Sequence, residues 1–304
     1  METMFQALKK ILVFCFLILV LLIPISACSN QATPSASETP TKIAPTMTAT
    51  SDEPTATLVP AAAVVNGERV PLAWFESELA RYLMAQETLG NADINQADAR
   101  AIVLEDVLDL TLLAQAAKDA GFLITDEEVQ QKVDQMAEEL DLTTWMSEWG
   151  YSEADLIHSL RLEMLAAHQR NIIADSVPEI TEQVELRQVF AYTQEGAENA
   201  LVSLDSGRDF TEVAFQYDPT SGGYLGWVPR GYLLIPAVEE AAFNLPVDGI
   251  SDIIDSDIGF HILKVLDRGV RPLSPDARLI LQRQALYVWL EEKRQVSTIE
   301  VLID

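Results

Sequence analysis

The stretch between Asp218 and Val265 constrains the fold of this chain more than any other part of the sequence. It opens with an Asp-Pro pair and a Gly-Gly turn, and a short apolar segment follows. Pro236 then stands where a helix can begin, because a proline at the first helical position removes no helical hydrogen bond. After an Asp-Gly turn, residues 259–265 form an apolar run that one histidine, His261, interrupts. This order predicts a strand, a helix and a second strand in one small domain.

The anchors of this stretch, in their order and spacing, resemble the parvulin family of peptidyl-prolyl cis-trans isomerases. The resemblance covers residues 185–269. It implies a four-stranded antiparallel sheet flanked by helices, and an enzyme that speeds rotation about X-Pro peptide bonds. The residues that carry it are Gly223, Leu225, Gly226, Trp227, Arg230, Gly231, Glu240, Ala241, Ala242, Phe243, Gly259, Phe260, His261 and Ile262.

Rotation about an X-Pro bond sets simple chemical requirements. The barrier of a peptide amide is about 18–20 kcal/mol, because the twisted state loses its resonance. Lowering that barrier takes an apolar slot for the proline ring and polar groups that stabilise the twisted amide. Neither a metal nor a cofactor is needed, and we expect none.

His261 and Gln188 are the polar groups best placed for this role. Alternation along a strand puts His261 on one face with Leu263, and Gln188 on one face with Leu186. Both side chains then lie among apolar neighbours and need hydrogen-bond partners. Taken alone, a histidine on an apolar strand is more often a satisfied core residue than a catalytic one.

The resemblance implies a role for each of these positions. Parvulins carry a hydrogen-bonded pair of histidines on two central strands, and His261 stands at the second position while Gln188 replaces the first. Asp218 matches an acidic position near the substrate amide, although before a proline it is also an ordinary turn residue. Ser256 matches a hydroxyl position, and Ile258 replaces a second hydroxyl. The predicted proline slot is lined by Leu225, Leu233, Val238 and Phe243, with Val238 where a phenylalanine is common.

The N-terminal residues predict export from the cytoplasm. Lys9 and Lys10 precede an apolar run from Ile11 to Ile23, and Ala27-Cys28 follows. This order resembles a bacterial lipoprotein signal peptide over residues 1–27, with Cys28 as the acylated residue. An uncleaved membrane anchor is the alternative, although the run is shorter than the roughly 20 residues of a spanning helix. Either way, the rest of the chain is expected outside the cytoplasm, anchored to the cell membrane.

The remaining segments predict a tether and a helical domain. Residues 28–61 are rich in Ser, Thr, Pro and Ala, a composition typical of a disordered tether. The segment 62–184 opens with Val-Val-Asn-Gly-Glu, which predicts a hairpin, and continues with amphipathic helices. It resembles the N-terminal domain of the SurA and PrsA extracytoplasmic foldases. The segment 272–304 predicts a helix and an apolar strand, Ile299–Ile303, which needs a partner strand. We expect it to complete the helical domain around the parvulin-like insert at 185–271, giving an α+β chain.

The net charge of −27 excludes two classes of partner. Proteins that bind nucleic acid need a basic surface. Docking on anionic lipid headgroups also needs clustered Lys and Arg. We therefore expect no nucleic acid partner, and contact with the membrane only through the N-terminal lipid.

Three functions remain open on the sequence alone. The first is a membrane-anchored isomerase that acts on unfolded or extended, proline-containing exported polypeptides. The second is a non-catalytic holdase chaperone that binds such chains with a degenerate parvulin domain, and Gln188, Ile258 and Val238 favour it. The third is a structural or assembly lipoprotein, which affinity for proline-containing peptides would exclude.

The lipid anchor can be tested by substituting Cys28. We expect Cys28→Ala to release the protein from the membrane fraction or to leave an unprocessed precursor, because the acylated thiol is lost. Fractionation followed by mass spectrometry of the N-terminus measures both outcomes. A variant that is processed and retained like the wild type would contradict the anchor.

Overall fold

The structure, a computed structural model, describes residues 59–91 and 93–303. The predicted signal peptide, Cys28 and most of the predicted tether lie outside these residues. The chain divides into two compact units. The first contains the described residues up to Leu108, together with Gln130–Ser159 and the residues from Ile299, and the second contains Asp109–Val129 and Leu160–Thr298. Within residues 59–91 and 93–303, no helix is both long enough and apolar enough to cross a membrane.

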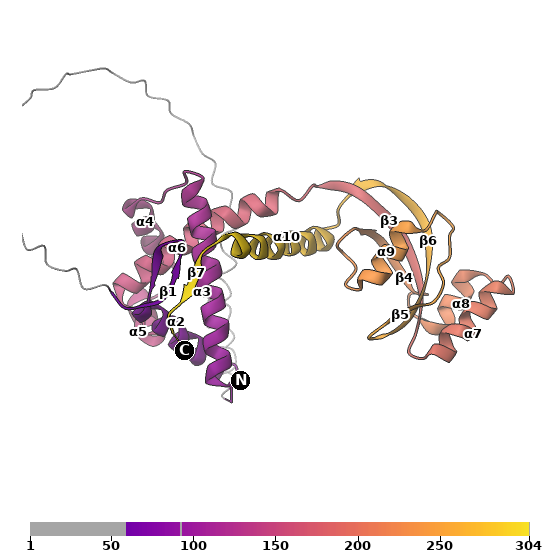
Figure 1. Cartoon of the computed structure of the whole chain (residues 1–304), viewed down its shortest axis with the longest axis horizontal. Coiled ribbons are helices and arrows are strands. Elements are labelled where there is room, and N and C mark those ends of the chain that lie inside the picture. Colours follow the sequence, from indigo (N-terminus) through magenta and orange to yellow (C-terminus); the bar gives the residue numbers. More distant parts are fainter. Residues whose placement is uncertain (1–58, 92, 304) are drawn as a thin grey trace, which may run out of the picture. The chain divides into compact units, whose positions relative to one another are not determined.

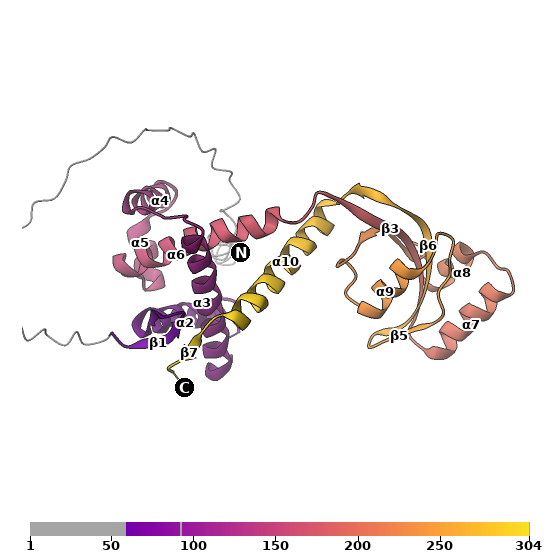
Figure 2. The ribbon, with the colours of Figure 1, turned by 45° about the horizontal axis from the view of Figure 1, so that its top comes forward.

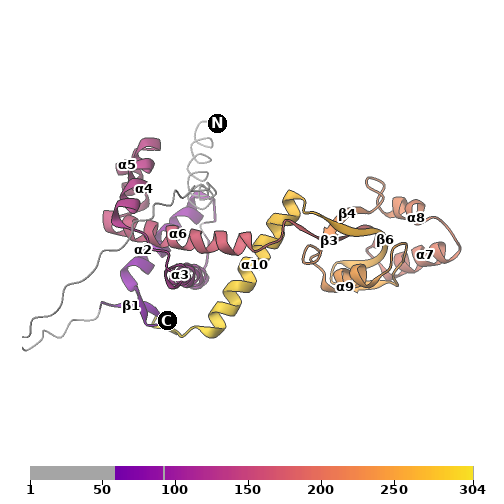
Figure 3. The ribbon, with the colours of Figure 1, turned by 90° about the horizontal axis from the view of Figure 1, so that it is seen from above.

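The first unit contains a three-stranded sheet with the order β2-β1-β7. Strands β1 (Ala61–Val65) and β2 (Glu68–Pro71) form the predicted hairpin. Its turn has positive φ at both central residues, Asn66 (50°) and Gly67 (85°), as a tight hairpin turn requires. Strand β7 (Ile299–Val301), labelled in Figure 1, pairs antiparallel with the other edge of β1, so the predicted pairing of the tail is confirmed. Figure 3 shows the C-terminus next to β1.

Five helices follow β2 in the chain, and several have the predicted caps. Thr125 and Glu128 form a reciprocal capping box at the start of α4, with Thr125 N donating to Glu128 Oε2 at 2.8 Å. The aromatic residues Trp145, Trp149 and Tyr151 suggest a packed connection in the sequence, but the structure has a short helix at Leu142–Trp149. Asp141 caps this helix by accepting a hydrogen bond from Thr144 N, and Gly150 ends it in the left-handed conformation (φ 66°). The helices are α2 (Leu72–Thr88), α3 (Gln96–Asp119), α4 (Asp126–Glu139), α5 (Leu142–Trp149) and α6 (Glu153–Asp175).

The second unit contains the predicted four-stranded antiparallel sheet, with the order β4-β3-β6-β5. The two central strands are longer than predicted. They pair with each other from Ile180 opposite Pro272 to Ala191 opposite Phe260, so the sheet begins before residue 185. The predicted domain boundaries near residues 184 and 272 stay a prediction. The strands are β3 (Ile180–Ala191), β4 (Tyr224–Pro229), β5 (Ile254–Ser256) and β6 (Gly259–Pro272).

Helices cover both faces of this sheet, as Figures 1 and 2 show. On one face, Leu186 and Leu263 pack against α9 (Pro236–Asn244). On the other face, Val189 and Ile262 pack against α7 (Gln194–Asp205) and α8 (Phe210–Tyr217). The central strands are therefore buried on both sides, and their alternation assigns each residue to one of two cores.

Helix α10 (Pro275–Val296) belongs to the second unit. Its side chains Leu286, Trp289 and Leu290 pack with residues of α3 and α6 in one hydrophobic cluster. Arg294 also donates to Asp109 of α3, with Nε at 2.9 Å from Oδ1. The predicted apolar stripe of α10 was wrong at one position, since Leu279 is 55% exposed.

The tail pairing generates a test of stability. Deleting Ile299–Asp304 removes the partner of β1, including the bond from Leu302 N to Ala62 O at 2.8 Å. We expect the free energy of unfolding to fall by about 2–4 kcal/mol, because several backbone hydrogen bonds are lost. Thermal unfolding measures the loss, and hydrogen exchange at Ala62 and Val64, whose backbone groups face β7, localises it. Leu302→Ala, which keeps the backbone, is the control, and an unchanged deletion variant would contradict the pairing.

Candidate functional site

Three predicted site residues meet on the α9 face of the second sheet. Nδ1 of His261 lies 3.1 Å from Oε1 of Gln188, and Nε2 lies 2.9 Å from Oγ of Ser256. His261 and Gln188 come from the paired strands β6 and β3, and Ser256 ends β5 beside them. The structure therefore contains the hydrogen bond expected between His261 and Gln188. It also links Ser256 directly to His261, which the sequence did not predict.

Ser256 offers His261 a hydroxyl that can donate or accept a hydrogen bond. Its Oγ lies 2.8 Å from the carbonyl oxygen of Gly259 and 2.9 Å from Nε2 of His261. A neutral imidazole has one N–H and one bare nitrogen, so its two partners must supply one acceptor and one donor. An amide offers either its NH₂ group or its oxygen after a half-turn about its last bond. Gln188 therefore satisfies His261 in both protonation states.

Burial controls the charge of His261. The side chain is 3% exposed, and its ring lies 5.0 Å from the ring of Phe190, the residue opposite it on β3. Desolvation lowers the pKa of His261 below its usual 6.5, because the cation loses contact with water. The ring is therefore neutral at pH 7.

The four predicted slot residues belong to one hydrophobic cluster on the same face of the sheet. Val238 and Phe243, on α9, are buried inside this cluster. Leu225 of β4 and Leu233 of the following loop are only partly buried, so these two remain accessible to a ligand. Arg230, which was not predicted as a site residue, places its guanidinium 4.3 Å from the centre of the Phe243 ring. Such a contact is a cation–π interaction.

Asp218 accepts several hydrogen bonds within its own turn. Its carboxylate accepts from Thr220 N at 3.0 Å, Ser221 N at 3.2 Å and Gly223 N at 3.1 Å, and from the hydroxyl of Ser221. These bonds, led by the Ser221 hydroxyl, lower the pKa of Asp218 to about 2. Among the hydrogen bonds of the described residues, none joins Asp218 to His261 or Gln188. Asp218 holds the turn that precedes β4.

Gly223 connects that turn to the backbone of the site residue Gln188. Its N–H bonds to Asp218, and its carbonyl oxygen accepts from Gln188 N at 2.8 Å. Gly223 has a φ of +67°, and a Cβ there would lie 1.8 Å from the carbonyl oxygen of Gln188. Only glycine fits this approach. The Gly-Gly turn noted in the sequence therefore lies against the backbone of Gln188.

The slot is held by a further acidic residue that the sequence analysis missed. Glu239 of α9 accepts from Gly231 N at 2.7 Å and from Leu233 N at 3.4 Å. It thereby shapes the loop that carries Leu233. In the part of the chain that the structure describes, no group of three or more His, Cys, Asp or Glu side chains could hold a metal ion.

Comparison with known families agrees with this geometry. Residues 1–170 match the SurA-like N-terminal domain, and residues 179–267 match the PPIC-type PPIase domain. The chain belongs to the SurA-like family. Its two central strands, with His261 and Gln188, lie almost wholly in the PPIC-type match.

Relatives of the chain carry the names of folding factors. It is 27% identical to the foldase protein PrsA of Geobacillus kaustophilus over 179 residues, which are 55% of this chain and 62% of that protein. It is also 27% identical to PrsA of Caldanaerobacter subterraneus over 231 residues, 69% of this chain and 74% of that one. The chain thus spans less than two thirds of the first relative's length. A crystal structure of the peptidylprolyl isomerase PrsA from Bacillus anthracis covers 63% of this chain and 94% of its own, with 18% identity and a TM-score of 0.44.

The contact between His261 and Gln188 predicts how a negative charge at position 188 would change the pKa of His261. We expect Gln188→Glu to raise the pKa of His261 by about 1 unit or more, because a carboxylate at Nδ1 stabilises the imidazolium. Titration of the histidine ring protons by NMR measures the shift, with His261→Gln used for assignment. Gln194→Glu, at the exposed start of α7, is the matched control.

The lowered pKa of His261 also makes the stability of the wild-type fold depend on pH. The folded pKa of His261 lies below the unfolded value, so the unfolded chain binds the proton more readily. Stability from this residue is present above about pH 6.5 and is lost as the pH falls towards the folded pKa. A folded pKa above 6.5 in the wild type would contradict the role of burial.

Proposed function

We propose that this protein is an extracytoplasmic peptidyl-prolyl cis-trans isomerase that assists the folding of exported proteins. The observation that carries the proposal is the neutral, buried His261, bonded to Gln188 and Ser256 beside an apolar cluster with two accessible leucines. The match of residues 179–267 to the PPIC-type PPIase domain supports the same reaction. Names such as foldase, given to its relatives, support a role in folding.

The proposed mechanism is non-covalent. Leu225 and Leu233 receive the proline ring, backed by the buried Val238 and Phe243. The polar network of His261, Gln188 and Ser256 favours the twisted amide, whose nitrogen and oxygen no longer share charge by resonance. Asp218 acts through the turn that it holds, since its oxygens already accept several hydrogen bonds. No bond to the substrate forms or breaks, so neither a nucleophile nor a cofactor takes part.

The proposed partners are unfolded or extended polypeptides that contain proline and leave the cytoplasm. A lipid on Cys28 anchors the folded part to the outer face of the cell membrane, with residues 28–61 as the tether. The net charge of −27 supports a surface that stays apart from nucleic acid and anionic lipid.

A non-catalytic holdase is the second candidate. Three replacements favour this candidate. Gln188 stands in place of a histidine, Val238 in place of a larger side chain, and Ile258, which is 63% exposed, in place of a hydroxyl. In this case the apolar cluster binds proline-containing segments without changing their isomerisation rate.

The enzyme proposal is tested by exchange of an X-Pro peptide, followed by NMR or a protease-coupled assay. We expect measurable catalysis by the fragment from Val59 to Asp304, which keeps β1 whole. His261→Ala should lower kcat/KM by about tenfold or more, because it removes the ring from the polar network and leaves the Gln188 side chain unpaired at a cost of about 1–3 kcal/mol. Gln188→His should keep or raise the activity. His168→Ala, on α6 and stacked on Phe122, is the matched control.

Two outcomes separate the candidates. Loss of catalysis in His261→Ala, but not in His168→Ala, supports the isomerase. A wild-type protein that suppresses aggregation of an unfolded client without accelerating X-Pro exchange refutes the isomerase and supports the holdase.

A further inference from the structure

The loop between β4 and α9, residues 230–235, carries Leu233 of the proposed slot. On its inner side, the carboxylate of Glu239 accepts from the backbone N–H groups of Gly231 and Leu233. Gly231 has a φ of +85°, which lets the loop turn back towards α9. The position of Leu233 is therefore set by a few polar contacts rather than by a regular strand.

On its outer side, the same loop is bonded to α10. The hydroxyl of Tyr232 donates to Oδ2 of Asp276 at 2.7 Å, and the ring of Tyr232 packs on the slot cluster. Asp276 lies in the first turn of α10, where the helix dipole favours a negative charge. Hydrogen bonds, first from Ser274 and then from Tyr232, lower the pKa of Asp276. The acceptor is thus ionised at neutral pH, and a bond to an ionised acceptor is among the stronger ones.

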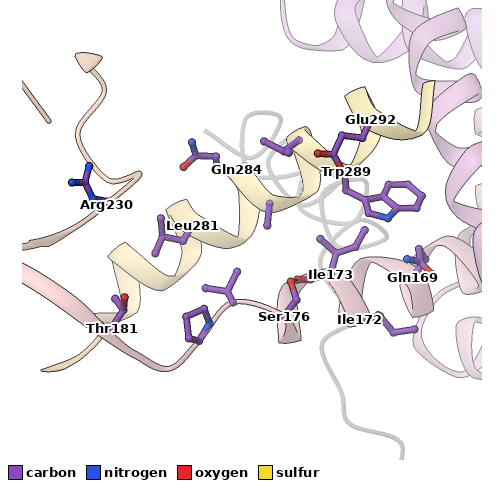
Figure 4. A pocket seen from close by; sticks show the side chains of 14 residues that line it. Gln169, Ile172, Ile173, Ser176, Thr181, Arg230, Leu281, Gln284, Trp289 and Glu292 are labelled. Atoms are coloured by element: carbon purple, nitrogen blue, oxygen red, sulfur yellow. The ribbon is translucent and has the colours of Figure 1, made fainter. Parts of the chain in front are cut away.

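The contact between loop and helix is close at Gly231. A Cβ on Gly231 would lie 2.6 Å from Oε1 of Gln284 and 2.9 Å from Cδ2 of Leu281, both on α10. Figure 4 shows Leu281 and Gln284 on the side of α10 towards the loop of Arg230. A cavity of about 650 Å³ lies next to this contact, lined by Arg230, Leu281 and Gln284 among others. Of this loop only Arg230 borders the cavity, whereas Tyr232, Leu233 and Ile235 pack on the slot cluster, so the bond between Tyr232 and Asp276 joins the packed part of the loop to α10.

We propose that Tyr232 and Asp276 are positioning residues for the proline slot, through which α10 sets the place of Leu233. The proposal rests on the proposed function, and it adds a helix outside the matched PPIase segment to the parts that define the slot. The C-terminal half of that helix packs on α3 and α6 through Leu286, Trp289 and Leu290. Through α10, the slot is thereby connected to α3 and α6 as well as to the sheet.

Steady-state kinetics on an X-Pro peptide tests the coupling in the full folded chain. We expect Tyr232→Phe to raise KM by about three- to tenfold, the usual weight of one hydrogen bond, with kcat almost unchanged. Asp276→Asn should have a similar effect, and the double variant should lose little more than either single one. Tyr287→Phe is the matched control, because Tyr287 lies on the same helix and is 65% exposed. A KM within twofold of the wild type in both single variants would overturn the proposal.

Hydrogen exchange provides a readout that needs no catalysis. Gly231 and Leu233 donate their N–H groups to Glu239, so a loosened loop should exchange these two amides about three- to tenfold faster in Tyr232→Phe. The amide of Ile262, in the centre of β6, should keep its rate, whereas general destabilisation would speed all three. If the wild type fails to catalyse exchange, the proposed function fails, and the loop amides still decide this proposal. Unchanged rates at Gly231 and Leu233 would refute it.

Discussion

The pairing of β3 with β6 is the interaction on which the rest of the second unit depends. It runs from Ile180 and Pro272 to Ala191 and Phe260, with one register shift between Glu185 and Leu186 that leaves Leu266 without a partner in the ladder. One face of the pair forms the core under α9, and the other forms the core under α7 and α8. The same ladder brings Gln188 and His261 within hydrogen-bond distance. A one-residue slip of either strand would turn its own site residue and its own core residues to the opposite face, so the site and the fold depend on one register.

The proposed site is organised around a polar group that is expensive to bury. His261 is kept neutral by its surroundings, and both ring nitrogens have partners. A buried imidazole without those partners would cost stability, so Gln188 and Ser256 support the fold as well as the chemistry. Gln188 suits this position because its amide can donate or accept, whereas a carboxylate can only accept when ionised. The replacement of a histidine by glutamine therefore preserves the hydrogen bond while removing a titratable group.

Much of the fold and of the proposed site was predictable from the sequence. The contacts that were not predicted share one physical cause. Strand alternation predicted the faces of His261 and Gln188, and the Asn-Gly hairpin and the terminal strand were also predicted correctly, because these patterns are local or need only an obvious partner. The contact of Arg230 with Phe243 and the bond of Tyr232 to Asp276 were missed. Each depends on where a loop lies after the chain has folded, and neither periodicity nor composition carries that information. Helix α5 was missed because its tryptophans suggested a packed connection, although Asp141 and Gly150 are ordinary cap residues.

The strand β7 has a consequence for the order of events during synthesis and export. Its partner β1 is made early, yet β7 follows the whole isomerase-like segment and α10 in the chain. As the polypeptide emerges with its N-terminus first, β1 keeps one edge unpaired until Ile299–Val301 has also emerged. Closing so long a loop is slow compared with forming the local hairpin to β2. A nascent chain therefore passes through a stage with an open sheet edge, and it is prone to aggregate until β7 has paired with β1.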